Sequence, residues 1–168
     1  NDPKKAIEYF SKAIELKKSN AVTYNNRGVA YYGIGQYRLA IQDYDKAISL
    51  RQDFTAAYEN RGVAFYKLGQ YQSAIENYNK AIGLKNNFTD AYNNRGVAYY
   101  QLNQHELAIK DFNKAINLKQ DFTNAYSNRG LTYLKLGNVY LGCADMQKAC
   151  KLGMCNALEK AKRDGNCQ

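Results

Sequence analysis

The four cysteines carry the most reactive side chains of this chain, and all of them lie near its C-terminal end. They are Cys143, Cys150, Cys155 and Cys167. A clustered, even set of cysteines is typical of disulfides in an oxidising compartment, whereas reduced thiols pack as small apolar groups. A zinc site is the weakest of these three alternatives, because there is no CxxC pair and the single histidine, His105, is distant in the chain. We expect no metal.

Four arginines, each followed by a glycine, could bind phosphate or nucleic acid, or could form ion pairs inside the fold. They recur every 34 residues as Arg27, Arg61, Arg95 and Arg129. Asp43, Asp111 and Asp145 follow the same interval, with Asn77 in the place of a fourth aspartate. Because a buried arginine needs a carboxylate partner, we favour an internal ladder of arginine–aspartate pairs over a ligand site.

No group of residues in the sequence points to catalysis. His105 has no matching serine or cysteine partner, and there is no phosphate-binding P-loop. The segment Gly33-Ile34-Gly35 lacks the third glycine and the preceding strand of a dinucleotide-binding motif. We therefore expect that the protein is not an enzyme and uses no cofactor.

Helices that recur every 34 residues must position these groups. The segment YNNRGVAYY, from Tyr24 to Tyr32, returns unchanged from Tyr92 to Tyr100. Its aromatic and glycine positions follow one helical face, and a second helical pattern begins after Gly35. Each unit is therefore predicted to be two helices, and the recurring glycines are predicted to mark crossings too close for a side chain.

The second and third units resemble the tetratricopeptide repeat (TPR) family, whose 34-residue signature places small and aromatic residues at fixed positions on two helices. The matching residues are Tyr58, Gly62, Phe65, Ala74, Tyr78 and Ala81, and then Tyr92, Gly96, Tyr99, Ala108, Phe112 and Ala115. Tyrosine replaces the usual tryptophan, arginine replaces the leucine before the glycine, and the proline between units is absent. The resemblance implies an all-α, right-handed α-solenoid of helix-turn-helix repeats.

The register divides residues 1–168 into a single array of repeats. The complete units are 21–54, 55–88, 89–122 and 123–156, with a capping helix and tail at 157–168. Residues 1–20 are predicted to hold the second helix of a truncated repeat, at about 4–18, whose apolar face is only half covered. We therefore expect the chain to be a fragment of a longer repeat protein, or this edge to be covered by another molecule.

The same register places the cysteines between the last repeat and its cap. A capping helix that runs back antiparallel would bring Cys167 near Cys143 and Cys155 near Cys150. Two disulfides, Cys143–Cys167 and Cys150–Cys155, are then predicted, with packed free thiols as the alternative. A bond between Cys143 and Cys150 is not expected, because seven residues of helix separate them by about 10 Å.

In TPR proteins the first helices line the surface that meets ligands, so the resemblance implies a peptide-binding groove on first-helix residues. These are Asn25, Asn26, Val29, Tyr32, Glu59, Asn60, Val63, Tyr66, Asn93, Asn94, Val97, Tyr100, Ser127, Asn128, Leu131 and Leu134. Four of them, the ladder asparagines, share one position and resemble an amide ladder that binds an extended peptide backbone. They are Asn26, Asn60, Asn94 and Asn128. The alternatives are that these asparagines are only solvated, and that the tyrosines pack between repeats.

The formal net charge of +9 does not by itself favour nucleic acid, because most lysines fall on second helices and connections, which form a solvated outer face. Chaperone-binding TPR proteins clamp a terminal carboxylate with basic first-helix residues. Here the corresponding positions hold Asn25, Val29, Asn60, Asp90 and Asn94. A partner that ends in acidic residues is therefore not expected.

We predict a protein–protein interaction scaffold that binds an extended segment of a partner. The alternatives are a homo-oligomer that self-associates through the N-terminal edge helix and the solenoid ends and, less favoured, a module that binds anionic polymers. No run reaches the roughly 18 apolar residues of a membrane span. The clustered cysteines favour a periplasmic or secreted location, with the cytoplasm as the alternative.

Overall fold

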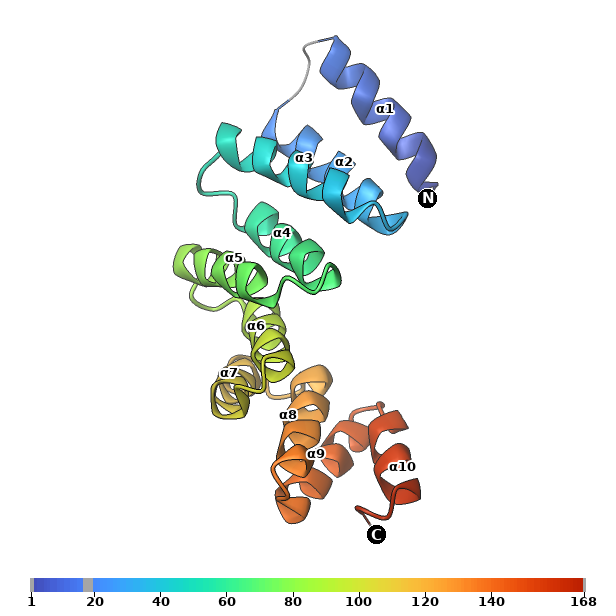
Figure 1. Cartoon of the computed structure of the whole chain (residues 1–168), viewed down its shortest axis with the longest axis vertical. Helices are drawn as coiled ribbons and strands as arrows, with labels where there is room; N and C mark the ends of the chain where they lie inside the picture. Colours follow the sequence, from blue (N-terminus) through green and yellow to red (C-terminus); the bar gives the residue numbers. More distant parts are fainter. Residues whose placement is uncertain (1, 17–19, 168) are drawn as a thin grey trace. The chain divides into compact units, whose positions relative to one another are not determined.

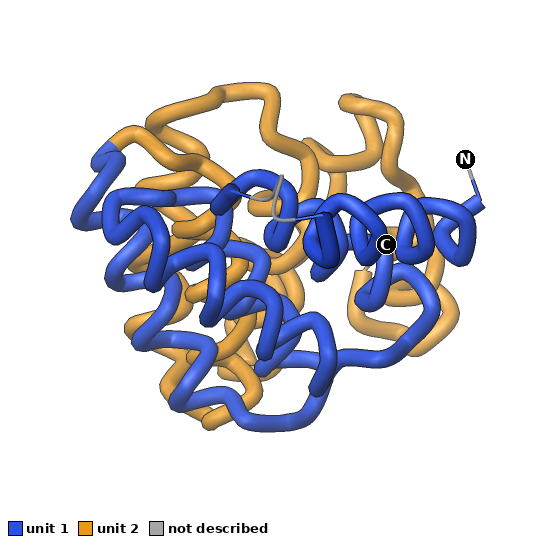
Figure 2. Tube along the Cα trace, turned by 90° about the horizontal axis from the view of Figure 1, so that it is seen from above, with its two compact units in different colours: residues 1–86 blue, residues 87–168 orange. Residues whose placement is uncertain are grey.

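The computed structural model describes residues 2–16 and 20–167. Its regular secondary structure within these ranges consists of helices, so the predicted all-α class is confirmed. The chain divides between Asn86 and Asn87 into two compact units, which are coloured separately in Figure 2. None of the helices in the described ranges is long and apolar enough to cross a membrane.

Unit 1 consists of one edge helix followed by two helical hairpins (Figure 1). Its helices are α1 (Pro3–Glu15), α2 (Ala21–Gly33), α3 (Tyr37–Leu50), α4 (Thr55–Lys67) and α5 (Tyr71–Leu84). The two helices of each hairpin pack along one another, while α1 packs against α2 and α3 against α4. The predicted edge helix is thus present, although it ends at Glu15 and residues 17 and 18 of its predicted range lie outside the described residues.

Unit 2 consists of two further hairpins and a short last helix. Its helices are α6 (Thr89–Gln101), α7 (His105–Leu118), α8 (Thr123–Lys135), α9 (Val139–Lys151) and α10 (Asn156–Arg163). The second hairpin packs against the first through α7 and α8, and α10 packs on α9. The capping helix is therefore found where the sequence predicts it.

The turn inside each hairpin requires one residue in the left-handed region. Gly35, Gly69 and Gly137 occupy this position with φ of 77°, 73° and 77°. In the third hairpin the same position is Asn103, with φ of 56°. Asparagine tolerates this conformation better than other residues with a side chain, so the turn is kept without glycine.

The core of the first three hairpins forms where a glycine of the first helix meets an aromatic ring of the second, whereas Gly130 of the fourth hairpin meets Met146. A Cβ atom at Gly28 would lie 2.7 Å from the ring of Tyr44, and one at Gly96 would lie 2.6 Å from the ring of Phe112. Small residues continue these close crossings, and Ala40 and Ala108 are fully buried. The predicted reason for the recurring glycines is therefore confirmed.

Helix α1 is covered on one side only. None of its residues is buried, and Tyr9 is 72% exposed. The residues predicted to be half covered, Ala6, Ile7, Phe10, Ala13 and Ile14, are all of intermediate exposure.

Candidate functional site

The first helices of neighbouring hairpins contact one another within each unit, α2 with α4 and α6 with α8. We call the residues that these pairs present beside the ladder asparagines the first-helix face. In unit 1 it contains Asn26, Val29, Tyr32, Glu59, Asn60, Val63 and Tyr66, and in unit 2 it contains Asn94, Val97, Tyr100, Asn128, Leu131 and Leu134. Val29 and Leu131 are its most open apolar side chains, with 46% and 41% exposed.

Asn25 and Asn93 do not belong to this surface, and their prediction as groove residues is wrong. They are only 7% and 6% exposed, and Ser127 at the same register is 8% exposed. The structure buries them because their side chains point between one hairpin and the next. Each instead accepts a hydrogen bond from a ladder asparagine of the following first helix.

Two ladder asparagines are held by these bonds. Asn60 donates from Nδ2 to Oδ1 of Asn25 at 3.0 Å, and Asn128 donates in the same way to Asn93 at 3.0 Å. The asparagines at these two positions are therefore not merely solvated. A side-chain amide has two donor hydrogens and a carbonyl oxygen with two lone pairs, so each bond orients the amide and leaves further capacity for a ligand.

The predicted groove tyrosines are half-buried and also pack inside their units. The rings of Tyr32 and Tyr37 lie 5.3 Å apart between centroids, and those of Tyr100 and His105 are also 5.3 Å apart. Partial burial raises the pKa of Tyr32, and the neighbouring Tyr37 is a second, smaller cause of the same increase. These rings therefore contribute to the packing between helices as well as to the first-helix face.

The repeated arginines form the predicted internal ladder. Arg27 donates from Nε and Nη2 to the two carboxylate oxygens of Asp43, at 2.7 Å each. Arg95 with Asp111 and Arg129 with Asp145 have the same two-pronged geometry. The bond to Asp43 raises the pKa of Arg27 despite its partial burial. Because the carboxylates are buried, these charges serve the fold rather than a ligand.

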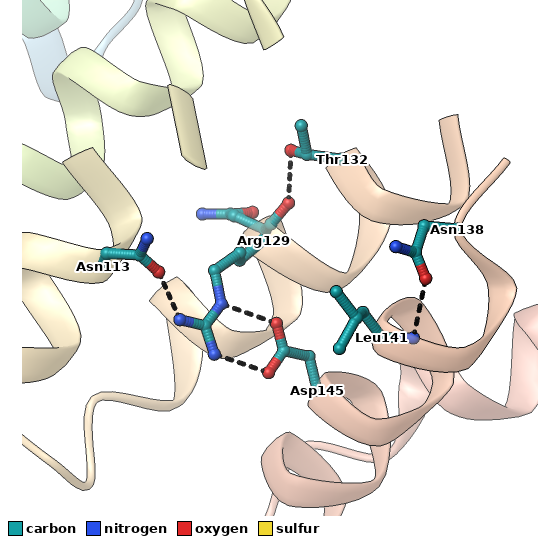
Figure 3. Close-up of polar contacts among 7 residues, drawn as sticks. Asn113, Arg129, Thr132, Asn138, Leu141 and Asp145 are labelled. Atoms are coloured by element: carbon teal, nitrogen blue, oxygen red, sulfur yellow. Dashed lines mark hydrogen bonds and ion pairs between the residues drawn. The ribbon is translucent and has the colours of Figure 1, made fainter. Parts of the chain in front are cut away.

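Three of the arginines also donate backwards to the preceding second helix, which the sequence analysis missed. Arg27 donates from Nη1 to Oγ of Ser11 at 3.1 Å. Arg61 donates from Nη1 to Asp45. Arg129 donates from Nη1 to Oδ1 of Asn113 (Figure 3). These polar partners lie 16 residues before their arginines, as far upstream as the aspartates lie downstream. That symmetric spacing was the available signal.

Both predicted disulfides are present in the structure. Cys143 of α9 bonds to Cys167 after α10, with 5.6 Å between their Cα atoms. Cys150 bonds to Cys155 across the turn between these helices, with 4.0 Å between their Cα atoms. Within the described ranges no group of three potential ligands could hold a metal ion. The cysteines therefore fasten the last helix to the last hairpin.

Models of the TPR family match most of the chain. Those described as tetratricopeptide repeat match residues 21–54 and residues 1–20 with 123–152, and one described as TPR repeat matches 64–103 and 98–137. The chain belongs to the tetratricopeptide repeat family. No curated protein sequence matches it.

Solved TPR structures share the fold. A crystal structure of MamA is 29% identical, covers 93% of this chain and 89% of its own, and gives a TM-score of 0.81. The first TPR of Spaghetti (RPAP3), bound to the HSP90 peptide SRMEEVD, is 26% identical over 70% of this chain and 94% of its own, with a TM-score of 0.69. YrrB is 24% identical over 96% of this chain and 84% of its own, with a TM-score of 0.80, and this similarity shows the fold alone. The predicted all-α TPR solenoid is confirmed, and these relatives support a protein-interaction scaffold.

Proposed function

We propose that the first-helix face of each unit binds an extended segment of a partner protein. The observation that carries this proposal is the fixed orientation of Asn60 and Asn128 by Asn25 and Asn93. An amide held in place loses less conformational freedom when it binds a ligand than one that is free to rotate. The oriented amides are therefore suited to pairing with the main chain of an extended peptide.

The side chains around these amides favour a segment with apolar groups. Val29 in unit 1 and Leu131 in unit 2 expose 46% and 41% of their surfaces beside the ladder asparagines. Burial of apolar area contributes about 25 cal/mol per Å². Main-chain bonds to the amides would give the segment its direction, and contacts with Val29 and Leu131 would give it much of its affinity.

The partner segment is not expected to end in acidic residues. The RPAP3 domain is bound to SRMEEVD, a peptide with acidic residues near its C-terminus. In this chain, the positions where chaperone-binding relatives carry basic residues hold Asn25, Val29, Asn60, Asp90 and Asn94. None of these residues is cationic, and the first-helix face contains no lysine or arginine, so a terminal carboxylate has no counter-charge there.

Selection of random linear peptides on the purified chain, followed by titration of the selected sequences, tests the proposal. Replacing Asn60→Ala with Asn128→Ala should weaken a selected peptide by about tenfold or more, which corresponds to 1.4 kcal/mol. The control is Asn117→Ala, an exposed amide on α7. Labelled SRMEEVD should bind neither protein.

The same titration needs a stability measurement, because each replaced asparagine also joins two hairpins. Loss of one such hydrogen bond costs about 1 kcal/mol of unfolding free energy. Urea unfolding should therefore show a modest loss with the fold retained at the binding temperature. Unchanged affinity of the selected peptides for the doubly replaced protein contradicts the assignment of the first-helix face.

A further inference from the structure

The outer side of α9 carries a row of side chains that differs from the same row on the other second helices. On α9 these residues follow one helical face at the spacing i, i+4, i+7, i+8 and i+11. We call them the α9 stripe. They are Tyr140, Ala144, Gln147, Lys148 and Lys151, and all of them are exposed. Tyr140 has 82% of its surface open to solvent.

The other hairpins show which residues the repeat carries at the first two positions of this stripe. In place of Tyr140 and Ala144 they have polar or charged side chains. These are Arg38 and Gln42 on α3, Gln72 and Glu76 on α5, and Glu106 and Lys110 on α7. All of these residues are exposed, although a further hairpin follows each of the three helices. Exposure of the stripe is therefore common to the repeats, and apolar side chains on it are particular to α9.

The charges of the stripe differ in the same way. Each of the three equivalent stripes contains one carboxylate, which is Asp45 on α3, Glu76 on α5 and Glu106 on α7. The α9 stripe contains none, and its ionised groups are Lys148 and Lys151. Asp145, the carboxylate of α9, is buried and bonded to Arg129. The stripe is therefore apolar at its N-terminal end and cationic at its C-terminal end.

A hollow of about 480 Å³ adjoins the apolar end of the stripe. On one side it is lined by Val139, Tyr140 and Ala144, and on the other by Gly165, Asn166 and Cys167. The disulfide from Cys167 to Cys143 fastens the second wall to α9. The charges of α10 and the residue after it do not reverse the sign, because Lys160, Lys162 and Arg163 outnumber Glu159 and Asp164.

These features fit a peptide better than a flat lipid surface. The hollow is concave, and the exposed amides of Gln147 and Asn166 lie at its walls, where they can bond to a main chain. An aromatic side chain beside a pocket is typical of the central contacts of protein interfaces. Lysines without neighbouring carboxylates favour a partner of the opposite charge.

We propose that the α9 stripe and its hollow form a docking surface for an acidic segment of another protein. An apolar side chain of the segment enters the hollow beside Tyr140, and its carboxylates pair with Lys148 and Lys151. The two ends of the stripe lie about 11 Å apart along the helix, which an extended chain covers in about three or four residues. This inference goes beyond the proposed function, because the surface shares no residue with the first-helix face.

Peptide selection with a matched variant tests the docking surface. Tyr140→Arg with Ala144→Gln gives α9 the residues that α3 carries, so the fold should be retained, and circular dichroism checks this. Short random peptides are selected on the whole chain, and those that also bind the variant are removed, which discards ligands of the first-helix face. The remaining peptides should bind the unaltered chain at least about tenfold more tightly than the variant. They should carry carboxylates about three or four residues from an apolar side chain.

Charge reversal tests the cationic end separately. Lys148→Glu with Lys151→Glu should weaken the remaining peptides by about tenfold or more. The control is Lys46→Glu with Lys80→Glu, which changes the net charge equally at exposed lysines of unit 1 and should leave their affinity unchanged.

The proposal is overturned if no peptide remains after the removal step, if the remaining peptides lack carboxylates, or if reversal of Lys148 and Lys151 leaves their affinity unchanged. It is also overturned by a dimer in light scattering, or by binding to phosphatidylserine vesicles, that Tyr140→Arg with Ala144→Gln abolishes. A second copy or a membrane would then occupy the surface. Ligands of the first-helix face should bind this variant normally, so the two proposals can fail separately.

Discussion

Asp45 on α3 forms an ion pair with Arg61 on α4, and this pair joins the two hairpins of unit 1. Arg61 differs from the other three repeated arginines, because its own hairpin offers the neutral Asn77 in place of aspartate. Asn77 still accepts a bond from Nε of Arg61 at 2.7 Å. The counter-charge of Arg61 therefore comes from the preceding hairpin.

Removal of the negative charge of Asp45 should lower the free energy of unfolding of unit 1. A new carboxylate at position 77, on the other side of Arg61, should restore it. The Arg61 side chain is only 21% exposed, so Asp45→Asn leaves a largely buried cation without a carboxylate. We expect a loss of about 1 kcal/mol in the free energy of unfolding, measured with urea. Asn77→Asp in the same protein should recover it by restoring the fork seen at Arg27. The control is Asp53→Asn, in an exposed turn. Equal losses in the Asp45→Asn protein and in the protein that also carries Asn77→Asp would contradict this account.

Two glycines in unit 1 should respond to alanine with opposite signs. A Cβ at Gly28 would lie 2.7 Å from the Tyr44 ring, whereas nothing lies within 4 Å of a Cβ at Gly83 on α5. Gly28→Ala should therefore cost about 1–3 kcal/mol through overpacking. Gly83→Ala should stabilise by up to about 1 kcal/mol, because alanine is the better helix former. Thermal and urea unfolding of both variants measure the difference, and stabilisation by both replacements would show that helix propensity alone decides the outcome.

The contacts within one hairpin could be predicted from the sequence, because helical spacing determines which residues share a face. The meeting of Gly28 with the second helix and the fork from Arg27 to Asp43 both follow from the register. Contacts between hairpins could not be predicted in this way. Asn25 accepts a hydrogen bond from a residue 35 positions away, and the period alone does not reveal how far successive hairpins rotate. The bond from Arg61 back to Asp45 did leave a signal, because a polar residue lies 16 positions upstream of the arginine, and that signal was missed.

The two buried tyrosines of unit 1 should make the protein sensitive to alkali. Tyr44 and Tyr78 are each 1% exposed, and burial raises the pKa of both phenols above the ordinary value of 10.0. The folded state therefore holds these protons more tightly than the unfolded state, so their contribution is complete below pH 10 and falls as the pH rises above it. Each tyrosine should remove about 1.4 kcal/mol per pH unit in this range.

Urea unfolding at a series of pH values tests this expectation. Phe112 and Met146 hold the equivalent positions in unit 2, so phenylalanine is already accommodated by the repeat. Tyr44→Phe with Tyr78→Phe should flatten the decline in stability above pH 10. Tyr140→Phe, at a position that is 82% exposed, should leave it unchanged. An identical decline in both variants would assign the alkaline sensitivity to other groups.

The disulfide between Cys143 and Cys167 should hold α10 in place. This helix has eight residues, fewer than the roughly 12–15 that an isolated helix needs for marginal stability in water. The bond closes 24 residues, whereas Cys150–Cys155 closes five, so loop entropy gives about 3 kcal/mol for the first and about 2 kcal/mol for the second. Cys143→Ser with Cys167→Ser should therefore lower the unfolding free energy more than Cys150→Ser with Cys155→Ser. Loss of the Cys143–Cys167 bond should also speed trypsin cleavage after the exposed Lys160 and Lys162, and mass spectrometry measures this cleavage. Cleavage of the Cys143→Ser, Cys167→Ser protein at the rate of the unaltered protein would show that packing of Ala161 against Met146 suffices to hold the helix.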